Sequence, residues 1–236
     1  MGRLQLKREV VRLLNHPELI VVLRNLQEIP AKELLNPLFS CLCHPDETVR
    51  WHAVSAFGYA VAAMASEHLD DARIVMRRFL WMLNDESGGI GWGVPEAMGE
   101  VMFEHRTLAE EYAHMLVSYT VEDGPEPYQD GNFLEMPAMQ QGLLWGLCRV
   151  AGKHKDILLR RGIAANLGCY FSSPDSQVRG LACKLCGMLG ISSCRAMIIA
   201  ALSDHHPVRL YQDGDFIDCR VSDLARQALK HLSLVS

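Results

Sequence analysis

Two stretches of the chain share one pattern: residues 38–58 read LFSCLCHPDETVRWHAVSAFG, and residues 167–189 read LGCYFSSPDSQVRGLACKLCGML. Each has an apolar segment, then Pro-Asp, two further residues, Val-Arg, and a second segment rich in small residues. Apolar residues recur at spacings of three and four on both sides of the turn, as in amphipathic helices. Proline favours the end of the first helix, and Asp offers a side-chain oxygen to the start of the second. The pattern therefore predicts paired helices with the Val side chains inside and the Arg side chains along the turn.

These residues resemble the HEAT-repeat family. Looser matches lie at residues 13–19, 80–85 and 199–204, where a first helix is expected to end at His-Pro or at an Asp. The resemblance implies an all-α fold, an α-α superhelix of roughly five to six antiparallel helical pairs across residues 4–233. Such pairs stack because a single pair cannot bury its apolar face. We expect residues 1–236 to form a single HEAT-like repeat domain.

The composition fits this fold. Of the 236 residues, 49% are hydrophobic and 7% aromatic, which allows a sizeable core and favours helices over sheets. The net charge of −5 makes nucleic acid an unlikely partner, because binding along a phosphate backbone usually needs a basic face. We find neither a signal peptide nor an apolar run of about 18 residues, so we expect a cytoplasmic protein without a membrane span. The eight cysteines are expected to be reduced thiols.

Three turns are longer than the repeat pattern allows: residues 85–96, 122–133 and 204–216. The second and third carry YQDGNF (128–133) and YQDGDF (211–216), which begin 83 residues apart. This distance is about two repeat periods of roughly 40 residues, so we expect both hexapeptides at equivalent positions in their repeats. Two interpretations remain open. The hexapeptides are either structural turns, in which Asp-Gly reverses the chain and Phe packs on the next helix, or a paired partner surface.

The charge of the insertions favours a partner surface. Residues 85–100, 121–135 and 204–219 hold 13 of the 28 Asp and Glu residues and one basic residue, Arg209. Turns at equivalent positions of a solenoid line up along one edge, so the insertions are predicted to form an acidic ridge. Such an edge attracts a basic partner or a cation and disfavours DNA.

The leading hypothesis is a non-enzymatic protein-interaction scaffold. Its ridge and the adjoining groove would bind a protein or a basic peptide segment. We expect the contacts to come from the insertions and from the helix after the second one. The predicted partner-binding residues are Asp85, Glu86, Trp92, Glu96, Tyr128, Asp130, Asn132, Trp145, Arg149, Tyr211, Asp213 and Asp215.

The alternative is an enzyme or cofactor-handling protein on a HEAT-like scaffold. Phycobilin lyases carry HEAT-like repeats, and an apolar groove with acids would suit a tetrapyrrole; a metal-dependent enzyme is another version. Alkylpurine DNA glycosylases fit less well, because they need a basic concave surface. Deoxyhypusine hydroxylase uses His-Glu dipeptides for iron, and the order here is reversed at residues 67–68 and 104–105. No metal site or cofactor is predicted, because no group of Cys, His or Asp residues has a standard ligand spacing. No catalytic residue is predicted, because no nucleophile motif is present and the spacing of the carboxylates selects no acid/base pair.

Overall fold

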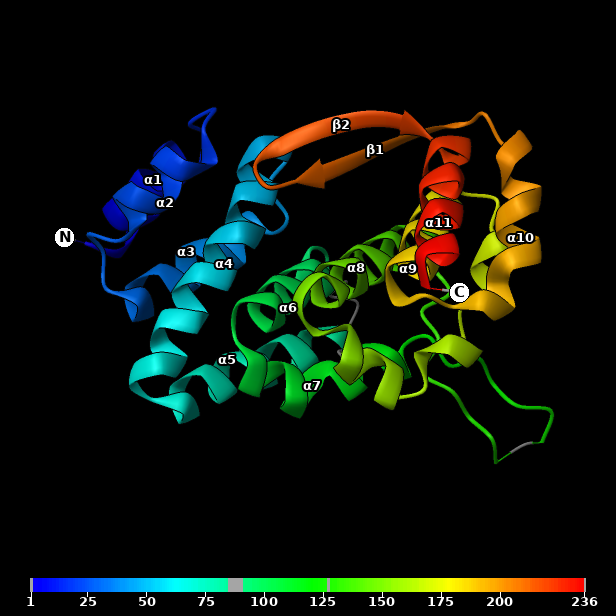
Figure 1. The fold of residues 1–236 in the computed structure, drawn as a ribbon. Helices are drawn as coiled ribbons and strands as arrows, with labels where there is room; N and C mark the ends of the chain where they lie inside the picture. Colours follow the sequence, from blue (N-terminus) through cyan, green and yellow to red (C-terminus); the bar gives the residue numbers. More distant parts are fainter. Residues whose placement is uncertain (1, 85–90, 127, 236) are drawn as a thin grey trace. The chain divides into compact units, whose positions relative to one another are not determined.

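The computed structural model describes residues 2–84, 91–126 and 128–235, and these residues are mostly helical (Figure 1). The prediction of an all-α fold is confirmed. The α-helices are α1 (Arg3–Leu14), α2 (Leu19–Leu26), α3 (Ala31–Cys41), α4 (Glu47–Glu67), α5 (Leu69–Leu83), α6 (Val94–Glu104), α7 (Arg106–Ser118), α8 (Pro137–Arg160), α9 (Ser176–Leu189), α10 (Arg195–Ala200) and α11 (Val221–Val235). Short 3-10 helices are η1 (Ile163–Ala165), η2 (Cys169–Ser172), η3 (Ser192–Cys194) and η4 (Ala201–Ser203), and two strands are β1 (Pro207–Gln212) and β2 (Asp215–Arg220).

The two Pro-Asp turns begin α4 and α9 as the sequence predicts. Asp46 Oδ1 accepts a hydrogen bond from the Val49 N–H at 3.1 Å, and Asp175 Oδ1 accepts one from the Val178 N–H at 3.1 Å. Each bond satisfies one of the backbone donors that a helix start leaves unpaired. Val49 and Val178 are buried, so the template's inward-pointing residue is confirmed in both turns.

The template's Arg lies along the turn in the second copy. The Arg179 guanidinium donates to the Ser173 carbonyl at 2.8 Å and pairs with Asp204 at 2.7 Å. Burial opposes ionisation of Asp204, but the hydrogen bonds from Arg179 and His206 prevail and lower its pKa to about 2. Arg179 therefore ties the Pro-Asp turn before α9 to the segment that follows η4.

Close contacts divide the chain into two compact units. The first comprises Met1–Leu108 and Tyr211–Asp215, and the second comprises Ala109–Leu210 and Phe216–Ser236. A single domain over residues 1–236 stays a prediction. Among the described residues, no helix has the length and apolar character that a membrane crossing requires.

The core of the first unit is built around α4, which packs against α3, α5 and α6. Phe39, Phe57 and Phe79 come from three of these helices and form a cluster with ring centroids 4.8 to 5.1 Å apart. Gly58 of α4 allows α6 to approach, because a Cβ atom there would lie 2.6 Å from Cγ of Glu100. Large apolar side chains thus fill this core, and one glycine allows α4 and α6 to pack closely.

The core of the second unit is built around α9, which packs against α8 and α11. A Cβ atom on Gly187 would lie 2.5 Å from the Ala228 Cα, so these two small residues let α9 and α11 pack closely. The cysteines of α9, Cys183 and Cys186, are buried in this core, as is Cys194. They occupy small apolar positions rather than a ligand cluster.

A β-hairpin interrupts the helical pattern between η4 and α11 (Figure 1). Its turn is Asp213-Gly214, and both residues have positive φ, at 52° and 106°. Asp-Gly favours a two-residue hairpin turn of this type. Val208 and Leu210 are buried while Arg209 between them is exposed, so β1 alternates as a half-buried strand does. The Asp-Gly dipeptide predicts a chain reversal here, but the strands on either side of it were not predicted.

Candidate partner-binding surfaces

The first candidate surface is the α7–α8 loop, residues 119–136, which projects from the second unit (Figure 1). The Gly131 N–H donates to Asp123 Oδ1 at 2.7 Å, and the Leu134 N–H donates to the Tyr119 carbonyl at 3.2 Å. A Cβ atom on Gly131 would lie 2.1 Å from the Val121 carbonyl oxygen, so only glycine fits at this crossing. The loop is therefore folded back on itself and held by its own polar groups.

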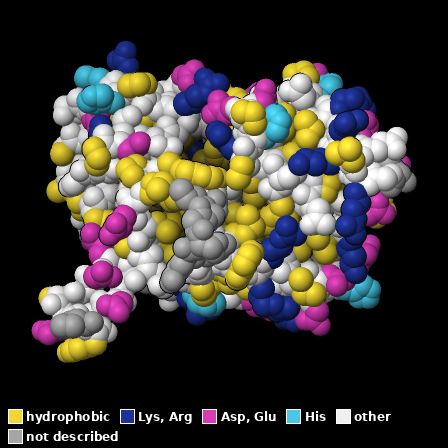
Figure 2. Space-filling view, turned by 180° about the vertical axis from the view of Figure 1, so that it is seen from behind, with side chains coloured by type: hydrophobic (Ala, Val, Ile, Leu, Met, Phe, Trp, Pro, Cys, Tyr) yellow, Lys and Arg dark blue, Asp and Glu magenta, His cyan; other side chains and the backbone are white. Residues whose placement is uncertain are grey.

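Acidic side chains cover this loop. Figure 2 shows Asp and Glu gathered on the projecting loop without Lys or Arg beside them. Residues 121–135 contain five acids and no basic residue, and all five acids are exposed. Tyr128 is 80% exposed, and Asp130 and Asn132 are exposed as well. Three of the predicted partner-binding residues thus lie on one accessible loop.

A pocket of about 280 Å³ lies at the base of the same loop. We call it the Phe133–Tyr170 pocket after its two aromatic rings, whose centroids are 5.6 Å apart with an interplanar angle of 31°. Its other walls include Glu122, Glu135, Gln140, Cys169 and residues 172–174. Phe133 is the last residue of YQDGNF, and Tyr170 comes from η2.

Burial sets the electrostatics of this pocket. Tyr170 is 1% exposed, and its hydroxyl has no hydrogen-bond partner among the described residues. Burial, followed by the nearby Cys169 and Glu122, raises the pKa of Tyr170 above its ordinary range. Burial and Glu122 likewise raise the pKa of Cys169 to about 11. Both groups are therefore neutral near pH 7, and the glutamates supply the charge.

The second hexapeptide, YQDGDF, forms the tip of the hairpin. Tyr211 is 3% exposed, its ring stacks on Trp51 at 4.9 Å, and its hydroxyl lies 3.1 Å from Ser55 Oγ. Gly214 also lies against Leu19, since a Cβ atom there would be 2.8 Å from the Leu19 Cβ. The structure thus gives Tyr211 a packing role within the first unit. Asp213 and Asp215 remain exposed at the tip.

The twin hexapeptides therefore share a place in the order of elements but not a conformation. One joins α7 to α8 and the other lies between α10 and α11, so each follows one α-helix and precedes the next. Phe133 packs on Tyr170, whereas Phe216 lies under the Arg209 guanidinium at 4.6 Å. The alignment of all three insertions along one edge stays a prediction.

The first insertion contributes two described candidates, Trp92 and Glu96, while Asp85 and Glu86 lie outside the described residues. Trp92 is 38% exposed in the turn before α6. Glu96 lies in the first turn of α6, and its Oε2 atom is buried without a hydrogen-bond partner among the described residues. Burial raises the pKa of Glu96 to about 7, so this side chain differs from the exposed acids of the α7–α8 loop.

Two candidates on α8 are less exposed than those on the α7–α8 loop. Trp145 is buried and Arg149 is half-buried. Trp145 therefore packs within the second unit, and little of its side chain is accessible to a partner. Buried residues occur along most of α8 rather than on one narrow face. The helical spacing of Trp145 and Arg149 therefore could not distinguish a core position from a position that lines a groove.

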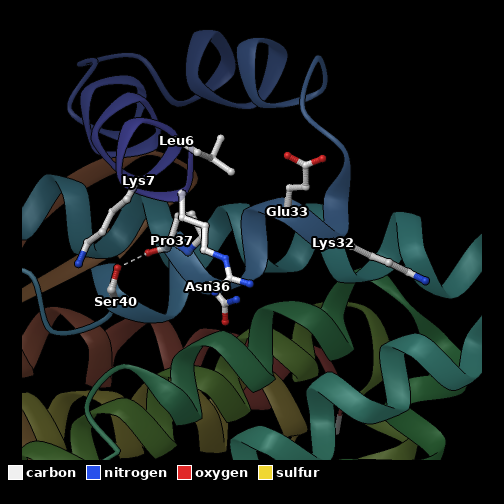
Figure 3. A pocket seen from close by; sticks show the side chains of 8 residues that line it. Leu6, Lys7, Lys32, Glu33, Asn36, Pro37 and Ser40 are labelled. Carbon is white, nitrogen blue, oxygen red and sulfur yellow. Dashed lines mark hydrogen bonds between the residues drawn. The ribbon is translucent and has the colours of Figure 1, made fainter. Parts of the chain in front are cut away.

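A second pocket, of about 490 Å³, lies between α1 and α3 in the first unit (Figure 3). Leu6 and Lys7 reach it from α1, and Lys32 and Pro37 reach it from α3 (Figure 3). Arg3 also lines it, so basic side chains outnumber the single acid, Glu33. Lys32 is paired with Asp71 at 2.7 Å, which reduces the free positive charge. This pocket was not predicted from the sequence; the signal available was the spacing of Arg3 and Lys7, one helical turn apart.

Among the described residues, no three His, Cys, Asp or Glu side chains are grouped as metal ligands. The buried thiols of Cys186 and Cys194 share a hydrogen bond, which lowers the pKa of Cys194 and raises that of Cys186.

Comparison with solved structures identifies the class of fold. An engineered protein matches with a TM-score of 0.54 and 14% identity, covering 99% of this chain and 98% of its own. A designed armadillo repeat protein matches with a TM-score of 0.51 and 15% identity, over 95% of this chain and 98% of its own. A second designed armadillo repeat protein, solved in complex with the peptide (KR)4, matches with a TM-score of 0.51 and 16% identity, over the same shares. No protein-family model and no curated protein sequence matches the chain. The chain therefore has the fold of an α-helical repeat solenoid.

Proposed function

We propose that this chain is a non-enzymatic scaffold of HEAT-like repeats that binds a basic peptide segment of a partner protein. The observation that carries the proposal is the α7–α8 loop, where five exposed acids occur without a basic residue. An acidic surface attracts a basic segment and orients it before contact. The exposed Tyr128 supplies apolar contact area beside these charges.

The fold supports a peptide as the partner. One designed repeat protein of similar fold was solved with a peptide of alternating Lys and Arg. Stacked helical repeats present extended surfaces, and an extended peptide can follow such a surface over several residues. Asp213 and Asp215 at the hairpin tip add a second acidic site to the proposal. A single repeat domain and a cytoplasmic location, both expected from the sequence, belong to the same proposal.

A direct binding measurement tests this function. Fluorescence anisotropy with labelled (KR)4 is expected to show binding that weakens as salt rises, because exposed charges are screened. The double variant Glu126→Gln/Asp130→Asn should raise the Kd roughly three- to tenfold, since each exposed ion pair contributes up to about 1 kcal/mol. The variant Asp213→Asn/Asp215→Asn tests the hairpin tip and keeps an Asn-Gly turn.

A matched control removes the same charge elsewhere. Glu18 and Glu28 are exposed in the first unit, so Glu18→Gln/Glu28→Gln lowers the net negative charge by the same amount. The proposal requires this control to bind (KR)4 nearly as the original chain does. Equal weakening by the control and the loop variant would show nonspecific attraction, and no binding at low salt would reject the function.

A further inference from the structure

Beneath the acidic loop, the Phe133–Tyr170 pocket combines features that suit one positively charged side chain. Its volume of about 280 Å³ is slightly smaller than that of ligand pockets, which typically run from ~300 Å³ upward. A single amino-acid side chain fills such a space better than a cofactor does. The pocket lies entirely within the second unit, and it opens at the base of the loop proposed to bind peptides.

The rings provide the first part of the recognition. Phe133 and Tyr170 lie 5.6 Å apart between centroids, and both line the pocket. The negative face of an aromatic ring attracts a cation, most strongly where water is excluded. An aliphatic stem of Lys or Arg also packs well against rings and against Pro137 or Pro174, which line the same pocket.

The carboxylates provide the second part. Glu122 and Glu135 line the pocket, and none of the described lining residues is Lys or Arg. A group entering between them meets negative charge, so an anion is repelled and a cation is favoured. Glu122 also lies close enough to Cys169 and Tyr170 to act on both groups. This places its charge at the aromatic wall.

The buried hydroxyl provides the third part. Tyr170 is 1% exposed, and its oxygen has no partner among the described residues although it belongs to a lining residue. A phenolic oxygen accepts hydrogen bonds, and a buried polar group without a partner is unfavourable. An ammonium or guanidinium group has N–H donors from which a phenolic oxygen can accept a hydrogen bond. Aromatic faces, carboxylates and an unsatisfied acceptor therefore all select for the same chemistry.

We propose that the Phe133–Tyr170 pocket is a specificity subsite that holds one Lys or Arg side chain of the bound basic peptide. The inference rests on the proposed function and deepens it, because it separates one recognised position from the general attraction of the loop. The exposed acids then provide long-range attraction, and the pocket fixes the register of the peptide. A peptide is bound in one register when a single side chain occupies a fitted pocket.

A coupling experiment tests the subsite. Each Lys of (KR)4 is replaced in turn by norleucine, which keeps the aliphatic chain and lacks the ammonium group, and each Arg by norvaline. One position is expected to lose about tenfold in affinity, more than its neighbours, because its charge lies against rings and carboxylates. When the protein carries Glu122→Gln, the same peptide replacement should lower the affinity only about threefold or less, because part of the charge contact is already absent. Such coupling indicates contact, since a structural disturbance would weaken every peptide alike.

Tyr170→Phe provides an independent variant that keeps the ring. It should weaken binding of unmodified (KR)4 about threefold without lowering the Tm, because the hydroxyl has no partner to lose among the residues that the structure describes. Glu126→Gln serves as the control, since Glu126 belongs to the loop but does not line the pocket. This control should weaken all peptides without coupling to any one position.

The outcomes separate the two proposals. If the Glu126→Gln/Asp130→Asn variant weakens (KR)4 binding but Glu122→Gln and Tyr170→Phe show no positional coupling or loss, the subsite is rejected and the scaffold function stands. If (KR)4 does not bind the original chain at all, the scaffold function fails and the subsite fails with it. The scaffold function and the subsite are both supported if Glu122→Gln reduces the effect of replacing one peptide position and Tyr170→Phe lowers the affinity for (KR)4.

Discussion

Replacing Glu96 by glutamine is expected to stabilise the protein at neutral and higher pH and to have little effect in acid. Glu96 lies in the first turn of α6, where a carboxylate is normally favoured by the helix dipole. Its Oε2 atom is nonetheless buried without a hydrogen-bond partner among the described residues. Burial dominates, and it raises the pKa of Glu96 from 4.5 to about 7 despite a hydrogen bond from its own backbone N–H and the nearby charge of Arg50.

The size and sign of the effect follow from this shift. Each pKa unit corresponds to 1.36 kcal/mol, so keeping Glu96 ionised in the folded chain costs about 3 kcal/mol. Below pH 4.5 the carboxyl is protonated in both states, and this cost is absent. As the pH rises from 4.5 to about 7 the unfolded chain releases this proton first, so the contribution of Glu96 to stability falls across this window and changes no further above it.

Urea denaturation at several pH values measures this directly. Glutamine has nearly the same shape and is uncharged, so Glu96→Gln should be more stable by about 3 kcal/mol near pH 8 and equal near pH 4. Glu67→Gln is the control, because Glu67 is exposed at the end of α4. It should change stability by the same small amount at both pH values.

One result would refute the reasoning. If Glu96→Gln destabilises the protein equally at both pH values, the carboxylate must make a favourable contact that glutamine cannot replace. Burial would then not be the dominant influence on its pKa.

Two further predictions concern the turns that define the fold. Asp46→Ala removes one N-cap bond and should lower the free energy of unfolding by about 1 kcal/mol. Asp175→Ala should cost more, about 2 kcal/mol, because Asp175 Oδ2 also accepts a 2.8 Å bond from Gln141; equal losses in urea denaturation would contradict this. At the hairpin tip, Tyr211→Phe loses the Ser55 contact and should cost about 1 kcal/mol, whereas Tyr211→Ala also loses the stack on Trp51 and should cost about 3 to 5 kcal/mol. Thermal denaturation followed by Trp fluorescence checks the pair, and a harmless Tyr211→Ala would show that the ring does not support the first unit.

Local chemistry explains which parts of the fold were predictable. Pro-Asp followed by Val-Arg specifies a turn and a helix start within six residues, and Asp46 and Asp175 make the expected bonds. The hairpin was missed because its alternation, with Val208 and Leu210 buried, covers only one short strand. Asp213-Gly214 beside that alternation was the signal available for the strands.

The twin hexapeptides show how flanking residues decide conformation. Alternating apolar residues precede YQDGDF, and they form β1. Gly-Pro-Glu-Pro precedes YQDGNF, and proline cannot donate to a strand ladder. Similar hexapeptides therefore take different structures, and the buried Tyr211 and exposed Tyr128 have different roles.

The Phe133–Tyr170 pocket was beyond sequence reasoning for a different reason. The acids of the loop were visible from composition, and so was their lack of basic neighbours. The pocket needs Glu122 and Phe133 beside Tyr170, which comes from a separate element. Only the packing of η2 against the loop brings these side chains together.

The position of Tyr211–Asp215 in the chain has a consequence during synthesis. These residues complete the first unit, whose other residues end at Leu108. At a translation rate of roughly 5–20 residues per second, the ribosome needs about 5 to 20 s to pass from one to the other. For that interval Trp51 and Ser55 have emerged without the tyrosine that covers them. The nascent first unit is therefore finished late, when most of the second unit has already been made.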